Sequence, residues 1–531
     1  MNILRAGSNG TTGPERRSDI RGKDPFFDML ARNGCSILTN PHNIESREQS
    51  LKDTWFGFYK IYCCKNGQIH DGRPLRDQSS GNFPKYFPGV SLARVREPMK
   101  DAVGRSRTGA YMAGVAEARE AVAQYYSVPP THLFFSAGIS DGIEMIHKVF
   151  LNNTKAKVLL PNESYPTHFS TAVMFGGRDL VVTVPRDHET GYPDFGDVSG
   201  GHNPFSQVGF SSFIPYGNPN PVVYPESFFR NDRGTGAFDL NEAATMNDPP
   251  GSRILRPVVL DMIYESFSWP ERHMRVRRLI ELSDEKNILI FVNSLSKVFL
   301  EPNKKAGVVA VYIPDRLRKY AEGSIVRDLE SDFQRRLGVI PNCSMEALVA
   351  AHRILASDIL DPDPELEMIR REGRRRFIGE DGKGGNQAVM RSLPHIKPLH
   401  PAVKIESSGY NLFFIDHPDV PWKKTEYKAV VMEKLKQVIL QIPDEDRRLE
   451  AMSAFDYYMR SISVAELAPS DIFCLDLVME TGVAFAPVER FYKLGTAPSV
   501  VAFRPVMVAE NDQFAADARL VSEFLVSKLG G

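Results

Sequence analysis

RPVVLD (256–261) and ILIFVN (288–293) are two short apolar stretches, each closed by a polar residue and separated by a more polar segment. Apolar, β-branched runs that alternate with helical stretches are typical of βα units, whose strands lie parallel in a buried sheet. Further runs of this kind are KVLLP (157–161), DLVVTVP (179–185) and GVVAVYI (307–313). The sequence therefore predicts an α/β fold, with a large domain at 76–318 built on a mostly parallel central sheet flanked by helices.

The rest of the chain divides into regions of different composition. Residues 1–75 predict an N-terminal arm, and 319–531 predict a smaller α+β C-terminal domain that ends in a strand-like run at 499–508 and a helix from Asp512. A charged amphipathic region at 422–463 predicts a helical insertion in that domain. The Gly/Pro/Asn-rich residues 200–256 predict long surface loops near the carboxyl edge of the sheet.

Composition excludes several classes of function. The 531 residues are 42% hydrophobic, with 65 Lys plus Arg against 66 Asp plus Glu, so no general positive charge attracts nucleic acid. No stretch approaches the roughly 20 apolar residues of a membrane span, and residues 1–24 lack the apolar core of a signal peptide. We expect a cytoplasmic protein without membrane or nucleic-acid partners. The five cysteines form no CxxC pair, so neither a metal site nor a disulfide framework is expected.

NSLSKVFLEPNKKAG (293–307) places Lys297 directly after an apolar strand. A lysine that attacks an aldehyde must be unprotonated, and a partly buried, electropositive setting lowers its pKa in this way. Hydroxyl groups and further cations, which suit a phosphate dianion, surround it in the sequence: Ser294, Ser296, Lys304 and Lys305. The alternative for Lys297 alone is a surface lysine at the end of a strand.

Asp261 closes the apolar strand that precedes the lysine segment. A buried carboxylate needs a cationic partner, which a protonated pyridine nitrogen provides, and that proton makes the ring an electron sink. Tyr264 follows Asp261 at the spacing of one helical turn. At this spacing its phenol could bind an oxygen substituent of the same pyridine ring. The alternative for Asp261 is a helix N-cap.

SAGISDGIEMIHKVF (136–150) contains a glycine followed by small residues and an amphipathic helix. The N-terminus of such a helix presents free N–H groups and a positive dipole end to an anion. A single glycine-rich turn of this kind is common, so it supports an anion site only together with other motifs.

The order of these motifs resembles the class I/II aminotransferase family of fold-type I enzymes, which depend on pyridoxal 5'-phosphate (PLP). The matching segments are SSGNFP (79–84), YMAGVAEAREAVAQYY (111–126), the 136–150 turn and helix, PNESYPTH (161–168), YGNPNP (216–221), DMIY (261–264), SLSK (294–297) and FRP (503–505). The resemblance covers about 76–318 well and the end of the chain weakly.

The resemblance implies roles residue by residue. Lys297 would bind PLP covalently and move the substrate proton, Asp261 would hold the pyridinium, and Tyr165 would stack on the ring. Tyr264 and Asn218 would bind the ring oxygen O3'. The residues that would bind the phosphate are Gly138, Ile139, Ser140, Ser294, Ser296 and Lys305, with Tyr111 reaching the phosphate of a neighbouring subunit. The residues that would bind the substrate are Arg504, Gly81 and Asn82. No metal is implied.

Two departures from the family pattern leave alternatives open. The family has arginine where Lys305 stands, so bidentate phosphate binding is lost and Lys304 is a candidate to share this role. The usual Asn-Pro-Thr-Gly is Asn-Pro-Asn-Pro here, so Asn220 is the alternative to Asn218 as the O3' ligand. Arg504 alone is also consistent with an edge-strand arginine that faces solvent.

The resemblance implies a PLP-dependent enzyme that acts on an amino acid through an external aldimine, as a homodimer or larger homo-oligomer with a shared active site. Transamination is the first expectation. Decarboxylation, elimination and β- or γ-replacement, including aminocyclopropane-carboxylate synthase-like and aspartate decarboxylase-like reactions, use the same motifs and remain alternatives. A PLP-binding regulator without turnover is a remote one, because residues 1–75 show no clear helix-turn-helix pattern.

Overall fold

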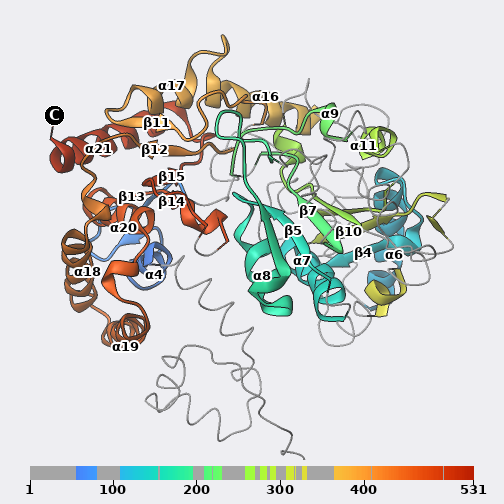
Figure 1. Ribbon diagram of the computed structural model, residues 1–531, viewed down its shortest axis with the longest axis horizontal. Coiled ribbons are helices and arrows are strands. Elements are labelled where there is room, and N and C mark those ends of the chain that lie inside the picture. The colour runs from blue at the N-terminus through green and yellow to red at the C-terminus, as the bar shows by residue number, and fades with distance from the viewer. Residues whose placement is uncertain are drawn as a thin grey trace, which may run out of the picture.

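A computed structural model gives the structure of the chain. The residues that it describes are 55–79, 108–153, 156–194, 208–217, 219–229, 257–268, 276–283, 287–294, 306–315, 317–318, 326–331, 364–407, 409–493 and 496–530. Within these ranges two main sheets lie beside each other, each with its own helices (Figure 1).

The larger sheet has seven strands within the described ranges, in the order β4-β10-β9-β8-β7-β5-β6. The strands are β4 (Leu133–Ser136), β5 (Val158–Pro161), β6 (Val181–Val184), β7 (Phe210–Phe213), β8 (Val258–Asp261), β9 (Leu289–Ser294) and β10 (Gly307–Tyr312). All neighbours are parallel except β10, which runs antiparallel to both β4 and β9. The prediction of a mostly parallel central sheet flanked by helices is confirmed.

Helices cover the larger sheet because the strands are apolar on both faces. The helices of this part are α6 (Thr108–Tyr125), α7 (Ile139–His147) with its π-helical continuation η4 (Lys148–Asn153), α8 (Pro166–Gly176), α9 (Glu226–Phe229) and α11 (Val276–Leu282). Helix α7 packs on β4, β9 and β10, and α8 packs on β5 and β6. Helix α6 buries an apolar stripe at Ala118, Val122 and Tyr125.

The smaller sheet has the order β11-β12-β15-β14 and antiparallel pairing throughout. Its strands are β11 (Ile396–Pro398), β12 (Phe413–Ile415), β14 (Ala486–Pro487) and β15 (Ala502–Arg504). The helices around it are α16 (Pro364–Ile378), α17 (Gly385–Ser392), α18 (Thr425–Leu440), α19 (Glu445–Ser461), α20 (Pro469–Thr481) and α21 (Asn511–Leu529). The predicted α+β character of the C-terminal part and its closing helix are confirmed. The helical region expected at 422–463 forms α18 and α19, which lie at the outer edge of this part (Figure 1).

The described N-terminal residues pack against the C-terminal part of the chain. Helix α4 (Trp55–Tyr62) contacts α19 and α20, and a short hairpin follows it, β1 (Cys64–Lys65) with β2 (Gln68–Ile69). Buried Asp471 of α20 accepts hydrogen bonds from the backbone N–H groups of Trp55 and Phe56, both at 3.1 Å, and so satisfies the first turn of α4. Strand β3 (Arg76–Asp77) then pairs in parallel with β13 (Val483–Ala484).

The expectation of long surface loops at 200–256 is wrong for residues 208–229. These residues include β7, which lies between β5 and β8 in the larger sheet and is buried along its whole length. The sequence of β7, FSSF, contains two serines and therefore does not form the continuous apolar run expected of a buried strand. It is buried because a central parallel strand is covered on both faces whatever the β-propensity of its residues. Over the described part of the chain, no helix is long and apolar enough to cross a membrane.

The start of β10 generates a stability prediction. A Cβ atom on Gly307 would lie 2.2 Å from Ser136 Oγ and 2.5 Å from the carbonyl oxygen of Gly138, so Gly307→Ala forces the backbone apart. We expect a loss of about 1 to 3 kcal/mol in the free energy of unfolding, measured by urea denaturation. Gly384→Ala is the control, because its Cβ meets nothing closer than 3.6 Å. Equal stability of the two variants would show that this contact is not tight.

Candidate active site

The register of β10 joins the segments that carry the expected phosphate ligands. Gly307 pairs with Ser136 at the end of β4 and with Ser294 at the end of β9. The turn that begins at Gly138 and the end of β9 are therefore held on opposite sides of one glycine. Ser296, Lys297 and Lys305 fall between Ser294 and Gly307 in the sequence, and they lie outside the described residues.

Gly138 directly precedes α7 and has φ 127° and ψ 173°. Side chains rarely tolerate this positive φ, which lets the chain turn sharply so that Ile139 and Ser140 begin the helix. The first N–H groups of α7 therefore lie at the end of β4. Gly307 of β10 and Ser294 of β9 pair at this same end of the sheet. A helix N-terminus of this kind presents free N–H groups and a positive dipole end, which suit an anionic group.

Asp261 lies at the carboxyl end of β8 and is fully buried. Its Oδ2 atom lies 3.0 Å from Nε2 of buried His168 in α8, and its Oδ1 atom accepts the N–H of Ile263 at 3.1 Å. Nδ1 of His168 lies 3.3 Å from the hydroxyl of Ser212 in β7. The 3₁₀ turn after β8 spans Glu265–Phe267 and has Tyr264 at its N-cap, so Asp261 does not cap it. Each carboxylate oxygen keeps a second acceptor position, which a ring N–H can use.

Tyr264 and Arg504 are linked through Tyr410, a residue that the sequence did not single out. The hydroxyl groups of Tyr264 and Tyr410 lie 3.1 Å apart, and the guanidinium of Arg504 stacks on the Tyr410 ring with its Cζ atom 3.9 Å from the centroid. Burial raises the pKa of Tyr264 well above its usual value, so its hydroxyl stays protonated and available as a donor.

Arg504 is an interior residue of the smaller sheet. Strand β15 lies between β12 and β14, and the side chain is 6% exposed, so the alternative of a solvent-facing edge arginine is wrong. Its Cζ atom lies 4.7 Å from the centroid of the Phe491 ring, and its Nη2 donates to the carbonyl oxygen of Ser79 at 2.7 Å. Ser79 opens the SSGNFP segment, whose Gly81 and Asn82 lie outside the described residues.

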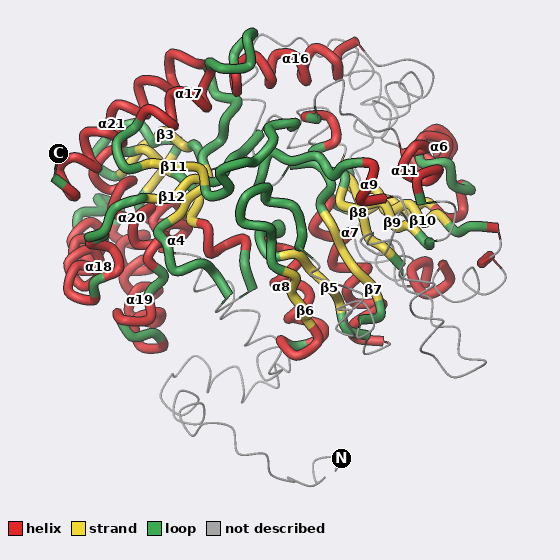
Figure 2. Tube along the Cα trace, turned by 45° about the horizontal axis from the view of Figure 1, so that its top comes forward, coloured by secondary structure: helices red, strands yellow, loops and turns green. Residues whose placement is uncertain are grey.

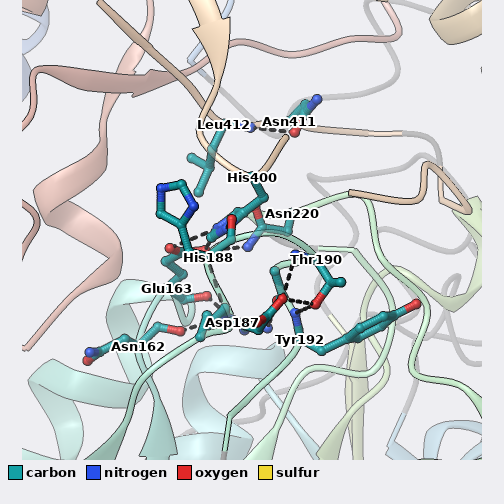
Figure 3. Close-up of polar contacts among 12 residues, drawn as sticks. Asn162, Glu163, Asp187, His188, Thr190, Tyr192, Asn220, His400, Asn411 and Leu412 are labelled. Carbon is teal, nitrogen blue, oxygen red and sulfur yellow. Dashed lines mark hydrogen bonds and ion pairs between the residues drawn. The ribbon is translucent and has the colours of Figure 1, made fainter. Parts of the chain in front are cut away.

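A buried ionic network lies beside the expected stacking residue Tyr165. The carboxylate of Glu163, which is 2% exposed, accepts hydrogen bonds from Nε2 of His400 at 2.9 Å and from the hydroxyl of Tyr492 at 2.5 Å. It also accepts from the side-chain amide of Asn220, and Arg186 Nε lies 3.8 Å away. Figure 3 shows Glu163, His400 and Asn220 directed toward one another. The partners come from four separate segments of the chain.

Hydrogen-bond geometry gives the charge state of this network. Nδ1 of His400 lies 2.9 Å from the carbonyl oxygen of His188, which only accepts, so Nδ1 carries a proton, and a second proton lies between Nε2 and the carboxylate. Burial by itself would raise the pKa of Glu163, but the charge and hydrogen bond of His400, with Arg186, lower it to about 2. Burial works to lower the pKa of His400, yet Glu163 outweighs it and raises that pKa. Both shifts favour a carboxylate at Glu163 and an imidazolium at His400.

The network also fixes the orientation of Asn220. A carboxylate only accepts, so Nδ2 faces Glu163, and the Oδ1 atom has no hydrogen-bond partner among the described residues. Asn220 thus uses its donor group within the network, while Asn218 lies outside the described residues. The backbone of Tyr111 belongs to α6, but its side chain is not described.

Four residues of these networks were given no role by the sequence motifs: His168, Glu163, His400 and Tyr410. His168 was the easiest of them to predict from the sequence, because it follows Tyr165 by one helical turn in PNESYPTH. Glu163 lies in the same segment, but its partner His400 lies 237 positions further along the chain. Only the folded chain brings the two together.

No family model and no curated protein sequence matches the chain. Its structure is similar to an aminotransferase from Escherichia coli, with 15% identity, a TM-score of 0.60, and 93% of this chain and 96% of that chain covered. Alanine aminotransferase from Pyrococcus furiosus gives 15% identity and a TM-score of 0.60 over 90% and 97% of the two chains. Tyrosine aminotransferase from Leishmania infantum gives 13% identity and a TM-score of 0.58 over 90% and 97%. The chain therefore has the fold of the fold-type I aminotransferases.

The Glu163–His400 pair generates a prediction about stability and pH. The ordinary pKa values are 4.5 for glutamate and 6.5 for histidine, and folding lowers the first and raises the second. The contribution of Glu163 is present above its ordinary value and is lost as the pH falls toward about 2. The contribution of His400 is present below its ordinary value and is lost as the pH rises through the raised pKa.

We therefore expect His400→Gln to lower the free energy of unfolding by about 2 kcal/mol near pH 6, as for a hydrogen bond to a charged group. The loss should become smaller at a higher pH, above the raised pKa of His400, where the wild-type imidazole is neutral. Urea denaturation of both proteins at the two pH values measures the difference. A loss of the same size at both would contradict the imidazolium assignment.

Proposed function

We propose that the protein is a PLP-dependent enzyme that acts on amino acids, with transamination as its reaction. The observation that carries this proposal is the fully buried Asp261 at the carboxyl end of β8. A carboxylate is costly to bury without a cation, and ligands of open α/β sheets bind at this edge. His168 supplies one partner and leaves acceptor capacity for a second, which suits a protonated pyridine nitrogen.

The described residues fit PLP at each of its polar ends. The turn at Gly138 and the N-terminus of α7 suit the phosphate, and Ser294 lies across Gly307 from them. The protonated hydroxyl of Tyr264 suits the ring oxygen. When bound, PLP supplies an electron sink that stabilises negative charge at the substrate Cα atom.

The chain's own groups then have distinct tasks. Asp261, positioned by His168, would hold the pyridinium, and Tyr264 would bind the ring oxygen O3'. Lys297 would hold PLP through its amine and would move the substrate proton. Arg504 binds the substrate carboxylate through its planar guanidinium, which the rings of Tyr410 and Phe491 hold in place.

The second ligand of O3' is Asn218 in this proposal. Asn220, the alternative, gives one of its two amide N–H groups to Glu163, which orients the amide nitrogen toward this carboxylate and presents the acceptor oxygen on the other side. An O3' phenolate requires a donor, so Asn220 is the poorer candidate. Ser296, Lys305, Gly81 and Asn82 keep the phosphate and substrate roles that the family resemblance implies.

Transamination is favoured over decarboxylation, elimination and replacement because the similar structures named above are aminotransferases. We further propose a homodimer in which Tyr111 reaches the phosphate of the neighbouring subunit. Incubation of the purified protein with PLP and a panel of amino acids and 2-oxo acids, followed by mass spectrometry, identifies the reaction. Release of CO₂ or of an unsaturated product, in place of an exchanged amino group, would overturn transamination.

Covalent attachment tests the lysine. We expect borohydride reduction of the protein with PLP to fix the cofactor to Nζ of Lys297, because only this lysine directly follows the strand that ends beside Gly307. Peptide mapping by mass spectrometry locates the adduct, and Lys297→Ala is the control that should lose it. An adduct on Lys304 or Lys305 would overturn the assignment.

Asp261→Asn tests the pyridinium partner. We expect turnover to fall on the order of 100- to 1000-fold, the usual cost of removing one preorganised electrostatic contact, because a neutral amide cannot hold the ring proton. The dissociation constant of PLP should rise much less, since the contacts to the phosphate are intact. Asp471→Asn is the matched control, as it alters a buried carboxylate that binds α4 instead. Near-normal turnover of Asp261→Asn would leave Asp261 with a structural role only.

A further inference from the structure

We propose that Glu163 is a positioning residue: its buried carboxylate holds Tyr165 in place and fixes segments of the smaller-sheet side against the active site. One part rests on the proposed function, namely that Tyr165 lies against PLP. The other part, that Glu163 fixes these segments, stands on the geometry of the chain alone.

The backbone at Glu163 is held in an unfavourable conformation. Its φ is 58°, in the left-handed region that residues with a side chain rarely adopt. Such a conformation persists where the surroundings determine it, and here hydrogen bonds fix both neighbours. Asn162 N donates to Val184 O at 2.7 Å, and Ser164 N donates to Phe491 O at 2.9 Å. The turn therefore sets the direction in which the chain reaches Tyr165 and α8.

Tyr165 lies in the electrostatic surroundings of the candidate active site. It is half-buried, it stands at the N-cap position of α8, and it is one of the groups that surround Tyr264, Tyr410 and Arg504. One helical turn later the same helix carries His168, the partner of Asp261. A shift of the turn at Glu163 would move the candidate stacking ring and the support of Asp261 together.

Arg186 locks the turn from the larger-sheet side. Its guanidinium donates to the carbonyl oxygens of Asn162 at 2.8 Å, Gly191 at 2.9 Å and Glu163 at 3.2 Å, and its Nε atom lies 3.8 Å from the Glu163 carboxylate. The side chain and the backbone of the turn thus share one cation, so loss of the carboxylate charge weakens both.

The other partners come from segments of the smaller-sheet side. His400 follows β11, and Tyr492 follows Phe491, whose ring covers the guanidinium of Arg504. In Figure 3, His400 reaches Glu163 from above while Asn220 approaches from another loop. The Glu163 carboxylate therefore connects the turn before Tyr165 with the segment whose Phe491 ring covers Arg504.

Glu163→Gln tests the proposal because it keeps the shape and removes the charge. Its amide can accept from Tyr492 but cannot accept at every position where the network donates. Asp476→Asn is the matched control, since buried Asp476 accepts from Trp422 Nε1 at 3.0 Å and from the Tyr427 hydroxyl at 2.9 Å, away from Glu163. Tyr492→Phe is a milder second variant, which removes one donor and leaves the ion pair.

Two readouts separate the parts of the proposal. Hydrogen exchange of the protein without added PLP should rise at least tenfold at residues 162–168 and 399–407 in Glu163→Gln, and less in Tyr492→Phe, but not in Asp476→Asn. With PLP, the visible circular dichroism of the bound cofactor should fall and its dissociation constant should rise about tenfold in Glu163→Gln only, at temperatures well below unfolding.

The outcomes are distinct. Unchanged exchange at 162–168 in Glu163→Gln would overturn the inference, whether or not PLP binds. Raised exchange with an unaltered cofactor signal would overturn the positioning of Tyr165 and leave Glu163 a structural residue. A wild-type protein that binds no PLP would overturn the proposed function, and the exchange readout would still decide whether Glu163 fixes the two segments.

Discussion

The pairing of Gly307 on both sides is the constraint on which the site depends. Strand β10 runs against its two neighbours, so its first residue meets the last residues of β4 and β9. Only a residue without a side chain allows the carbonyl oxygen of Gly138 to approach this closely. The N-terminus of α7 and the end of the strand before Lys297 are consequently held together by backbone hydrogen bonds, which are more rigid than a pair of loops.

Each charged group at the site is buried against a partner. Asp261 faces His168, Glu163 faces His400 and Arg186, and Arg504 lies between aromatic rings. Burial of a lone charge is expensive, so each of these groups is stable only where its partner is also held in place. The result couples elements of both sheets: α8 is linked to β8 through His168, and to the smaller-sheet side through the turn at Glu163. Figure 2 shows the loops that run between the two sheets in this region.

The fold was largely predictable because its signals are local. The apolar runs at 157–161, 256–261, 288–293 and 307–313 all form strands, since a strand covered on both faces reads as a continuous apolar stretch. Strand β7 was missed, because FSSF carries two serines and lies among turn residues. The run at 499–508 forms strand only at its centre, β15. In both cases the neighbouring strands, and not the local residues, decide where pairing occurs.

By itself the sequence determined the type of fold and the order of the motifs, including Asp261 at the end of a strand, Gly138 before a helix and Arg504 in a β-rich run. Chain order and apolar periodicity are enough for these, because each depends on residues close in the sequence. Only the tertiary structure decided the partners: His168 for Asp261, 93 positions away, and His400 for Glu163, 237 positions away. A polar residue in the sequence does not state whether it will be buried or which charge will meet it. That depends on how the sheets and loops come together, and the free energy of a buried charge is set by the partner it meets there.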